Sequence, residues 1–261
     1  MASNYWKDRL AATQTAIAEK STRAINQQLR KYYARAMERT IADFERTYNK
    51  LLASLAADKA PTPADLYKLD TYWKLQGQMR LELEKLGARQ IATMSKVFET
   101  NFFEIYHSFA WSSQDAFSKL DTNAVKQLIN QIWVADGKSW SQRIWDNTSL
   151  LMETLNEELI NCVAGGKPVG TLKKALMERF NVSYGRADAL ARTELAHIQT
   201  EAAKKRYEDY GIQMVEIWAD KDERRCEVCG KLHQTKYPVG AHVPIPAHPR
   251  CRCCIVPVVE E

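Results

Sequence analysis

Apolar residues recur mostly at intervals of three, four and seven positions through residues 5–56. An α-helix turns once every 3.6 residues, so this spacing places them on one face of a helix. The apolar positions are Trp6, Leu10, Ile17, Ala24, Leu29, Tyr32, Met37, Ile41, Phe44, Tyr48, Leu51 and Leu55. Neither Pro nor Gly interrupts the run. We therefore predict one long helix or two joined ones, with an apolar face that later helices must cover.

Capping and stop signals divide the middle of the chain into further helices. The sequence TPAD at 62–65 predicts a helix start, with Thr at the N-cap, Pro at the first position and Asp in the first turn. This helix is expected to reach about Leu86, bend at Gly87 and continue over about 88–119. Further helices are expected to start at Asp121 or Thr122, after Ser139, at Gly170–Thr171 and at about Tyr184. Helices are expected to end at Gly137, Gly165–Gly166 and Gly211.

The pattern changes after residue 211. Residues 212–220 alternate between apolar and polar side chains, which predicts a strand. Residues 254–259 are a second strand candidate, which Pro257 restricts to a sheet edge or a strand end. The predicted fold class is mainly α. Residues 1–180 form a region of long helices, and residues 181–261 form a small α+β module.

Composition and charge limit the class of protein. The chain of 261 residues is 45% hydrophobic and 26% charged, which is typical of globular domains. No apolar run approaches the roughly 20 residues that a membrane span needs, and the start lacks an apolar signal-peptide core. We therefore expect a protein of the cytosol, or one assembled there, that does not enter membranes.

The net charge of +5 is concentrated at the start of the chain. Residues 1–60 carry 11 Lys and Arg against 6 Asp and Glu, while the other residues are close to neutral. A basic first segment indicates an acidic protein surface or nucleic acid as partner. The alternative is a solvated helix face that has no partner.

Five of the six cysteines lie between residues 226 and 254, and Cys162 lies alone. A disulfide scaffold would be smaller and would space its cysteines through the fold. A cluster in a chain without a secretion signal instead indicates a metal site. Cys162 is expected to be an ordinary buried thiol.

The cluster offers five donors for the four positions of a tetrahedral zinc ion. Cys226 and Cys229 form a C-x-x-C pair, which lets both thiolates reach one ion from a tight turn. Cys251 is the third expected ligand, and His248 and Cys253 compete for the fourth position. Four protein ligands leave no position for water, so the predicted Zn²⁺ is structural and staples the C-terminal module.

Three other side chains near the cluster are weaker candidates. In an extended segment Cys254 points away from Cys253, because neighbouring side chains alternate between faces. His233 and His242 remain outside candidates for the metal.

The last part of the chain resembles the phage head morphogenesis family, also called the Mu F-like minor head proteins. The resemblance covers residues 186–257 and is carried by the sequences ARTE, RYEDYG, VEIWADKDERRCEVCGKLHQTKYPV and PAHPRCRCCIVPV. The matching positions are Arg192, Thr193, Glu194, Trp218, Asp220, Cys226, Cys229, His248, Pro249, Cys251, Arg252 and Cys253. Two departures are the Leu-His-Gln sequence at 232–234, where a small residue or glycine is expected, and the additional Cys254.

The resemblance implies a minor structural protein of a tailed-phage or prophage head, without enzymatic activity. Such proteins are present in few copies, associate with the portal, and act in head assembly or in the fate of the packaged DNA. The implied location is the virion, after assembly in the host cytoplasm. The implied partners are the portal protein and other head proteins, and the basic N-terminal helices are candidates for contact with packaged DNA.

The Arg192–Thr193–Glu194 motif lies in a predicted helix beside apolar residues. A charged pair there is costly to bury without partners, so we expect a structural ion pair or a contact that holds the helix to the cysteine module. The alternative is a catalytic Glu194 acting as a general base.

The alternative function is a zinc-containing nuclease of the His-Asn-His type, in which His242 or His248 would activate water near a second metal. Against this hypothesis, the chain after HPRCRCC holds only a strand, so no helix remains to complete that fold.

Overall fold

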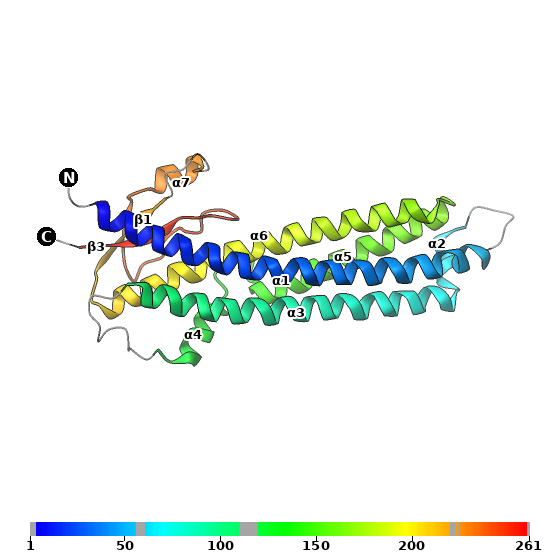
Figure 1. Cartoon of the computed structure of the whole chain (residues 1–261), viewed down its shortest axis with the longest axis horizontal. Coiled ribbons are helices and arrows are strands. Elements are labelled where there is room, and N and C mark those ends of the chain that lie inside the picture. The colour runs from blue at the N-terminus through cyan, green and yellow to red at the C-terminus, as the bar shows by residue number, and fades with distance from the viewer. Residues whose placement is uncertain (1–3, 56–60, 110–119, 220–222, 224, 260–261) are drawn as a thin grey trace. The chain divides into compact units, whose positions relative to one another are not determined.

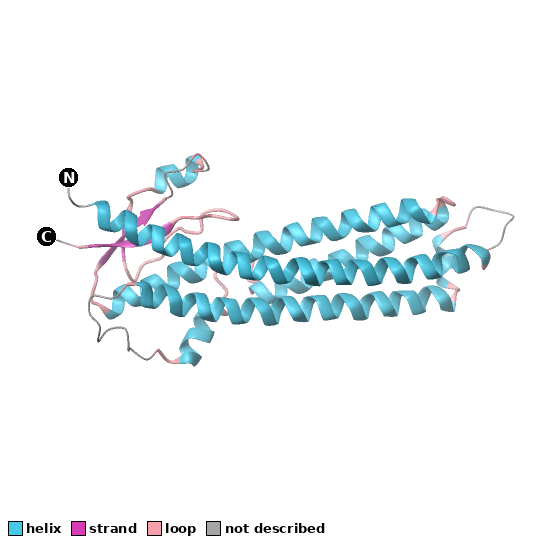
Figure 2. Ribbon diagram, in the orientation of Figure 1, coloured by secondary structure: helices cyan, strands magenta, loops and turns pink. Residues whose placement is uncertain are grey.

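The computed structural model describes residues 4–55, 61–109, 120–219, 223 and 225–259. Helices dominate, and the strands lie together in one small sheet (Figures 1 and 2). The elements are α1 (Asn4–Ala53), α2 (Pro63–Tyr67), α3 (Asp70–Ser108), α4 (Thr122–Ile129), α5 (Trp140–Ala164), α6 (Val169–Asp209), β1 (Met214–Trp218), α7 (Glu227–Leu232), β2 (Lys236–Pro238) and β3 (Cys254–Val258). The mainly α fold class is confirmed. None of the described helices combines the length and hydropathy needed to cross a bilayer.

Most helix ends lie where the capping signals predict them. The Thr62 N–H and hydroxyl both donate to the Asp65 carboxylate, at 3.1 and 2.7 Å, at the start of α2. The Asp121 carboxylate caps α4 by accepting the Asn123 N–H at 2.9 Å. Two helix stops are glycines with positive φ, Gly166 after α5 and Gly211 after α6. The predicted stop at Gly137 is wrong, because α4 already ends at Ile129 and Gly137 lies in the loop before α5.

Two predicted interruptions are absent. α3 runs through Gly87 without a break, and α6 is one helix that passes through Tyr184. Gly87 serves packing, because a Cβ built there would lie 2.6 Å from the Trp145 ring of α5. The weak helix formers near Tyr184 stay helical because Phe180 and Ser183 are buried, and tertiary packing overrides local propensity. α3 ends at Ser108, short of the predicted end at about residue 119, and residues 110–119 lie outside the described residues.

The chain forms two compact units, each assembled from separate segments. Unit 1 takes residues 1–26, 94–140 and 189–261, and unit 2 takes residues 27–93 and 141–188. The helices α1, α3 and α6 each contribute to both units. The division between residues 180 and 181 expected from the sequence falls inside α6 and stays a prediction.

Unit 2 is a helical bundle with a buried polar layer around Tyr33. The Tyr33 hydroxyl of α1 donates to the Ser183 carbonyl of α6 at 3.3 Å, and Asn147 of α5 donates to the Tyr33 oxygen at 3.2 Å. Gln90 of α3 lies at the same level, 3.5 Å from that hydroxyl. Burial raises the pKa of Tyr33 to about 12, so this residue stays a neutral hydrogen-bonding group. Tyr33 therefore links all four long helical segments of the unit.

Unit 1 holds the three-stranded sheet, in the order β2–β1–β3, and both pairings are antiparallel. β3 is an edge strand, as Pro257 predicts. Its Ile255 carbonyl accepts hydrogen bonds from Gln14 of α1 at 3.0 Å and from Tyr207 of α6 at 3.2 Å. These helices cover the open edge of β3, which would otherwise be free to pair with another chain.

The alternating pattern of β1 does not mark an exposed face. Val215, Ile217 and Trp218 are buried, and so is Glu216, whose side chain meets Lys7 of α1 at 2.5 Å. The strand β2 pairs with residues 214–216 of β1. This strand was not expected from the sequence.

Candidate metal centre

The C-x-x-C pair lies at the start of α7. Cys226 is the N-cap of this helix, and its Sγ accepts the Cys229 N–H at 3.4 Å. The Gly230 N–H donates to the Cys226 carbonyl at 2.9 Å, so the segment closes into one helical turn. The turn brings both sulfurs to the same side.

The second half of the cluster begins with a tight turn over residues 248–251. The Cys251 N–H donates to the His248 carbonyl at 3.1 Å. Pro249 occupies the second position of the turn, and Arg250, at the third, has a φ of 62°. Pro at the second position and positive φ at the third match a type II turn. This turn directs His248 and Cys251 toward α7.

The two halves converge on Cys229. The His248 Nε2 lies 3.3 Å from the Cys226 sulfur and 3.1 Å from the Cys229 sulfur, and the Cys229 and Cys251 sulfurs are 3.8 Å apart. Zn–S bonds of about 2.3 Å in a tetrahedron place two sulfurs about 3.8 Å apart. The five predicted donors thus form two overlapping groups: Cys226, Cys229 and His248, and Cys229, Cys251 and Cys253.

One nitrogen of His248 is already committed. A carbonyl oxygen only accepts hydrogen bonds, so the 2.9 Å contact between His248 Nδ1 and the Pro249 oxygen makes Nδ1 the donor. In neutral imidazole the other nitrogen, Nε2, then carries the free lone pair, and this is the atom that faces the sulfurs. Metal-binding histidines are generally oriented in this way.

The thiols differ strongly in acidity. The Cys253 side chain donates a hydrogen bond to Cys251, and backbone N–H groups add to it, so the pKa of Cys251 falls to about 5. Burial raises the pKa of Cys229 to about 12. The backbone N–H of Cys229 lowers the pKa of Cys226, and the hydrogen bond to Cys251 raises the pKa of Cys253. Binding of a metal would require each ligand thiol to release its proton.

The donor set therefore fits a structural zinc ion. Thiolate and imidazole donors suit Zn²⁺, and the Cys229, Cys251 and Cys253 side chains are buried. Four of the five donors would surround the ion and leave no position for water.

The motif around residue 193 meets the cluster through Thr193. Its hydroxyl donates to the Ala189 carbonyl at 2.7 Å and accepts the Arg250 N–H at 3.1 Å. Glu194 is buried and accepts the Trp133 Nε1–H at 2.9 Å, whereas Arg192 is exposed. The three consecutive residues therefore lie on different faces of α6.

The other motif residues lie in or after β1. Trp218 is buried and donates to Asp8 of α1 at 3.1 Å. Asp220 lies outside the described residues.

The outside candidates do not join the cluster within the described residues. The Cys254 sulfur faces the Trp218 carbonyl at 3.7 Å, as the alternation in β3 predicts. His233 accepts the Ala219 N–H at 3.2 Å through Nδ1, and His242 is exposed. Cys162 is buried, as predicted.

A buried histidine of α6 was missed by sequence analysis. His197 is 8% exposed and stacks on Trp133, with ring centroids 4.4 Å apart. Burial and the nearby Lys204 and His242 lower the pKa of His197 to about 4, so it is neutral at pH 7. The sequence signal for this contact was the three-residue spacing between Glu194 and His197, which places both side chains on the same face of the helix. Both side chains contact Trp133.

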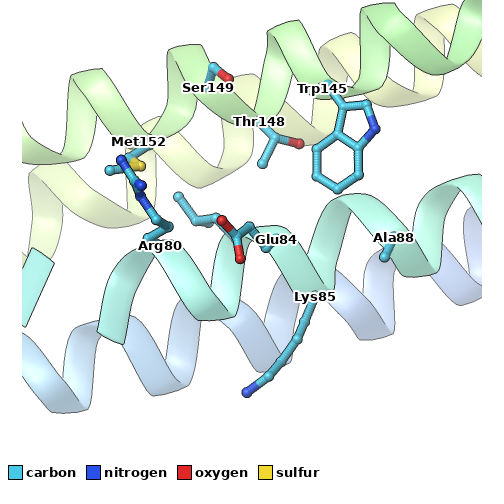
Figure 3. Close-up of a pocket in the computed structure, with 9 residues that line it drawn as sticks. Arg80, Glu84, Lys85, Ala88, Trp145, Thr148, Ser149 and Met152 are labelled. Atoms are coloured by element: carbon cyan, nitrogen blue, oxygen red, sulfur yellow. The ribbon is translucent and has the colours of Figure 1, made fainter. Parts of the chain in front are cut away.

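Unit 2 also has an open groove of about 660 Å³ between α3 and α5 (Figure 3). Its lining residues are Arg80, Leu83, Glu84, Lys85, Ala88, Trp145, Thr148, Ser149 and Met152. They include neither a cysteine nor a histidine.

Residues 153–256 match the family described as "Phage Mu protein F like protein". The match confirms the resemblance drawn from residues 186–257 and extends it into α5. No curated protein and no solved structure matches the chain.

Proposed function

Because residues 153–256 belong to the phage Mu F-like family of head morphogenesis proteins, we propose that this protein is a minor protein of a tailed-phage or prophage head. The family match is the observation that carries the proposal. The family is structural, and the corresponding role of this chain is assembly by binding.

The proposed partners are the portal protein and other head proteins. A minor component that joins the shell at the portal would be present in few copies per particle. It would enter the particle during assembly in the host cytoplasm and remain in the virion.

The proposed role of the cysteine cluster is structural. Zn²⁺ would be held by Cys226, Cys229, Cys251 and His248, with Cys253 donating its hydrogen bond to the Cys251 sulfur. Two observations support His248 over Cys253 as the fourth ligand. The His248 Nε2 atom lies within 3.3 Å of two sulfurs, and its Nδ1 atom already donates a hydrogen bond to the Pro249 carbonyl. The ion would join α7 to the loop before β3, in a module with little core of its own.

Contact with packaged DNA is proposed for the basic helix α1. Lys31 and Arg35 are exposed one turn apart, and neither has an ion-pair partner within the described part of the chain. Two such cations on one helix face suit the regular charge of a phosphate backbone. The same helix would act in handling or ejecting the genome.

The nuclease alternative gains no support from the geometry around His248. Its Nε2 faces two sulfurs and its Nδ1 donates to a carbonyl, so neither nitrogen is directed at a water nucleophile. The ligand loop is followed by the edge strand β3.

Quantitative mass spectrometry of purified particles tests the proposal, with proheads compared to mature virions. A few copies in both would support a minor head protein that stays with the genome. Presence in proheads alone would restrict the role to assembly. Absence from both would overturn the proposal and favour an activity in the host cell.

A further inference from the structure

We infer that Thr193 is a positioning residue for the metal centre, because its hydroxyl holds Arg250 in the left-handed conformation that the His248–Cys251 turn requires. The inference rests on the proposed zinc site. It assigns a specific role to one residue of the 192–194 motif.

The turn has a conformational problem at its third position. A type II turn needs positive φ there, and glycine normally supplies it, because a Cβ makes this region unfavourable. This chain has Arg250 with a φ of 62°. An outside contact must therefore favour this conformation.

Thr193 supplies that contact from a rigid element. Its hydroxyl proton is directed to the Ala189 carbonyl one turn earlier in α6, at 2.7 Å. This donation leaves the oxygen lone pairs free for the Arg250 N–H, which lies 3.1 Å away. The next residue, Glu194, is buried and accepts a hydrogen bond from Trp133, so this turn of α6 is held in place within the core of unit 1.

The consequence for the metal is geometric. With Arg250 held, the Cys251 N–H reaches the His248 carbonyl and the turn closes. Both donors of the turn then face Cys229, at 3.1 Å for His248 Nε2 and 3.8 Å for the Cys251 sulfur. Loss of the Thr193 bond would remove one contact that orders the turn before the metal binds.

The test compares Thr193→Val with Thr193→Ser in the full chain. Zinc affinity is measured by competition with a chromophoric chelator, and exchange of the Arg250 amide proton is followed by NMR in metal-free protein. Thr193→Val should weaken zinc binding by about tenfold, the lower end of the range for residues that orient metal ligands. Thr193→Ser keeps the hydroxyl and should stay within about twofold of the wild type.

Thr200→Val is the matched control. Thr200 lies two turns further along α6 and bonds its own i−4 carbonyl, Ala196, at 3.0 Å. It has no described contact with the ligand loop, so its replacement should leave zinc affinity and Arg250 exchange unchanged.

Two further results separate the possible failures. If the wild type binds no zinc, the proposed site is wrong, and Arg250 exchange in the metal-free variants alone decides whether Thr193 holds the turn. If the wild type binds zinc and Thr193→Val matches it in affinity and exchange, the inference is overturned. Arg250→Gly, which adopts positive φ without help, should recover affinity when added to Thr193→Val.

Discussion

The Trp218 Nε1–H donates to the Asp8 Oδ1 at 3.1 Å, which joins the end of β1 to the second turn of α1 across 210 positions of sequence. Beside it, the Lys7 ammonium meets the buried Glu216 carboxylate at 2.5 Å. The N-terminal part of α1 therefore belongs to the fold of unit 1, where it lies beside the sheet (Figure 1).

We expect Lys7→Met to destabilise unit 1, because the Glu216 carboxylate would remain buried without its cation. Breaking a buried ion pair from one side typically costs about 3 kcal/mol or more. The free energy of unfolding is measured by urea denaturation followed by circular dichroism.

The double variant Lys7→Met/Glu216→Leu is the control. Removing both charges should recover most of the loss, because an apolar pair is often as stable as a buried ion pair. A Lys7→Met protein with wild-type stability would show that this ion pair does not hold α1 to the sheet.

Gly87→Ala should destabilise unit 2. The new Cβ would lie 2.6 Å from the Trp145 ring, and this overpacking should cost about 1–3 kcal/mol. The matched control is Gly77→Ala on the same helix, where nothing lies within 4 Å of the added Cβ. That change should stabilise the helix by about 0.5–1 kcal/mol. Equal thermal unfolding midpoints for the two variants would contradict the role given to Gly87.

The fourth ligand can be identified with cobalt in place of zinc. The Cys253→Ser protein should retain the absorption bands of a Co²⁺ ion with three thiolates, whereas His248→Ala should lose affinity and change the spectrum. The reverse result, in which Cys253→Ser reduces thiolate-to-cobalt charge transfer and His248→Ala does not, would assign Cys253 as the ligand.

His197 should make stability depend on pH. Its pKa is about 4 in the folded protein and 6.5 as an ordinary histidine, so between these values the unfolded chain binds the extra proton. Stability is therefore complete above pH 6.5 and should fall by up to about 3 kcal/mol as the pH drops to 4.

The matched variant for this prediction is His197→Phe, which keeps an aromatic ring against Trp133. At equal zinc concentration, its unfolding free energy should decline less than that of the wild type between pH 6.5 and pH 4. If the unfolding free energy declined equally in both proteins between pH 6.5 and pH 4, His197 would not be the cause of the pH dependence.

Lys31→Gln/Arg35→Gln should weaken DNA binding and reduce its salt dependence. Each lost phosphate contact lowers the slope of log affinity against log salt by about 0.9. Arg179→Gln is the control, since that arginine is already paired with Glu158 at 2.6 Å. Fluorescence anisotropy with duplex DNA at several salt concentrations measures both. If the slope of log affinity against log salt were unchanged in the double variant, Lys31 and Arg35 would not contact DNA and would form a solvated surface of α1.

The sequence alone was sufficient for the features that depend on neighbouring residues. The apolar spacing of residues 5–56, the cap at Thr62 and the stop at Gly211 act within one or two helical turns, so they predicted α1, the start of α2 and the end of α6. The end of α2 at Tyr67 was not expected, because the predicted helix continued to about Leu86. The five metal-ligand candidates were also visible, because zinc requires donors of particular types at short spacings.

Tertiary structure decided the features that depend on distant partners. The sequence predicted a bend at Gly87, and only the packing of Trp145 from α5 shows that this glycine makes room for a ring. Glu216 reads as the exposed side of a strand, and only Lys7, more than 200 positions earlier, makes its burial possible. The sequence predicted that the 192–194 motif contacts the cysteine module, but only the fold shows that the Thr193 hydroxyl makes this contact, with the Arg250 N–H. Neighbouring residues determine the local backbone preferences, whereas burial and long-range hydrogen bonds exist only once the chain has folded.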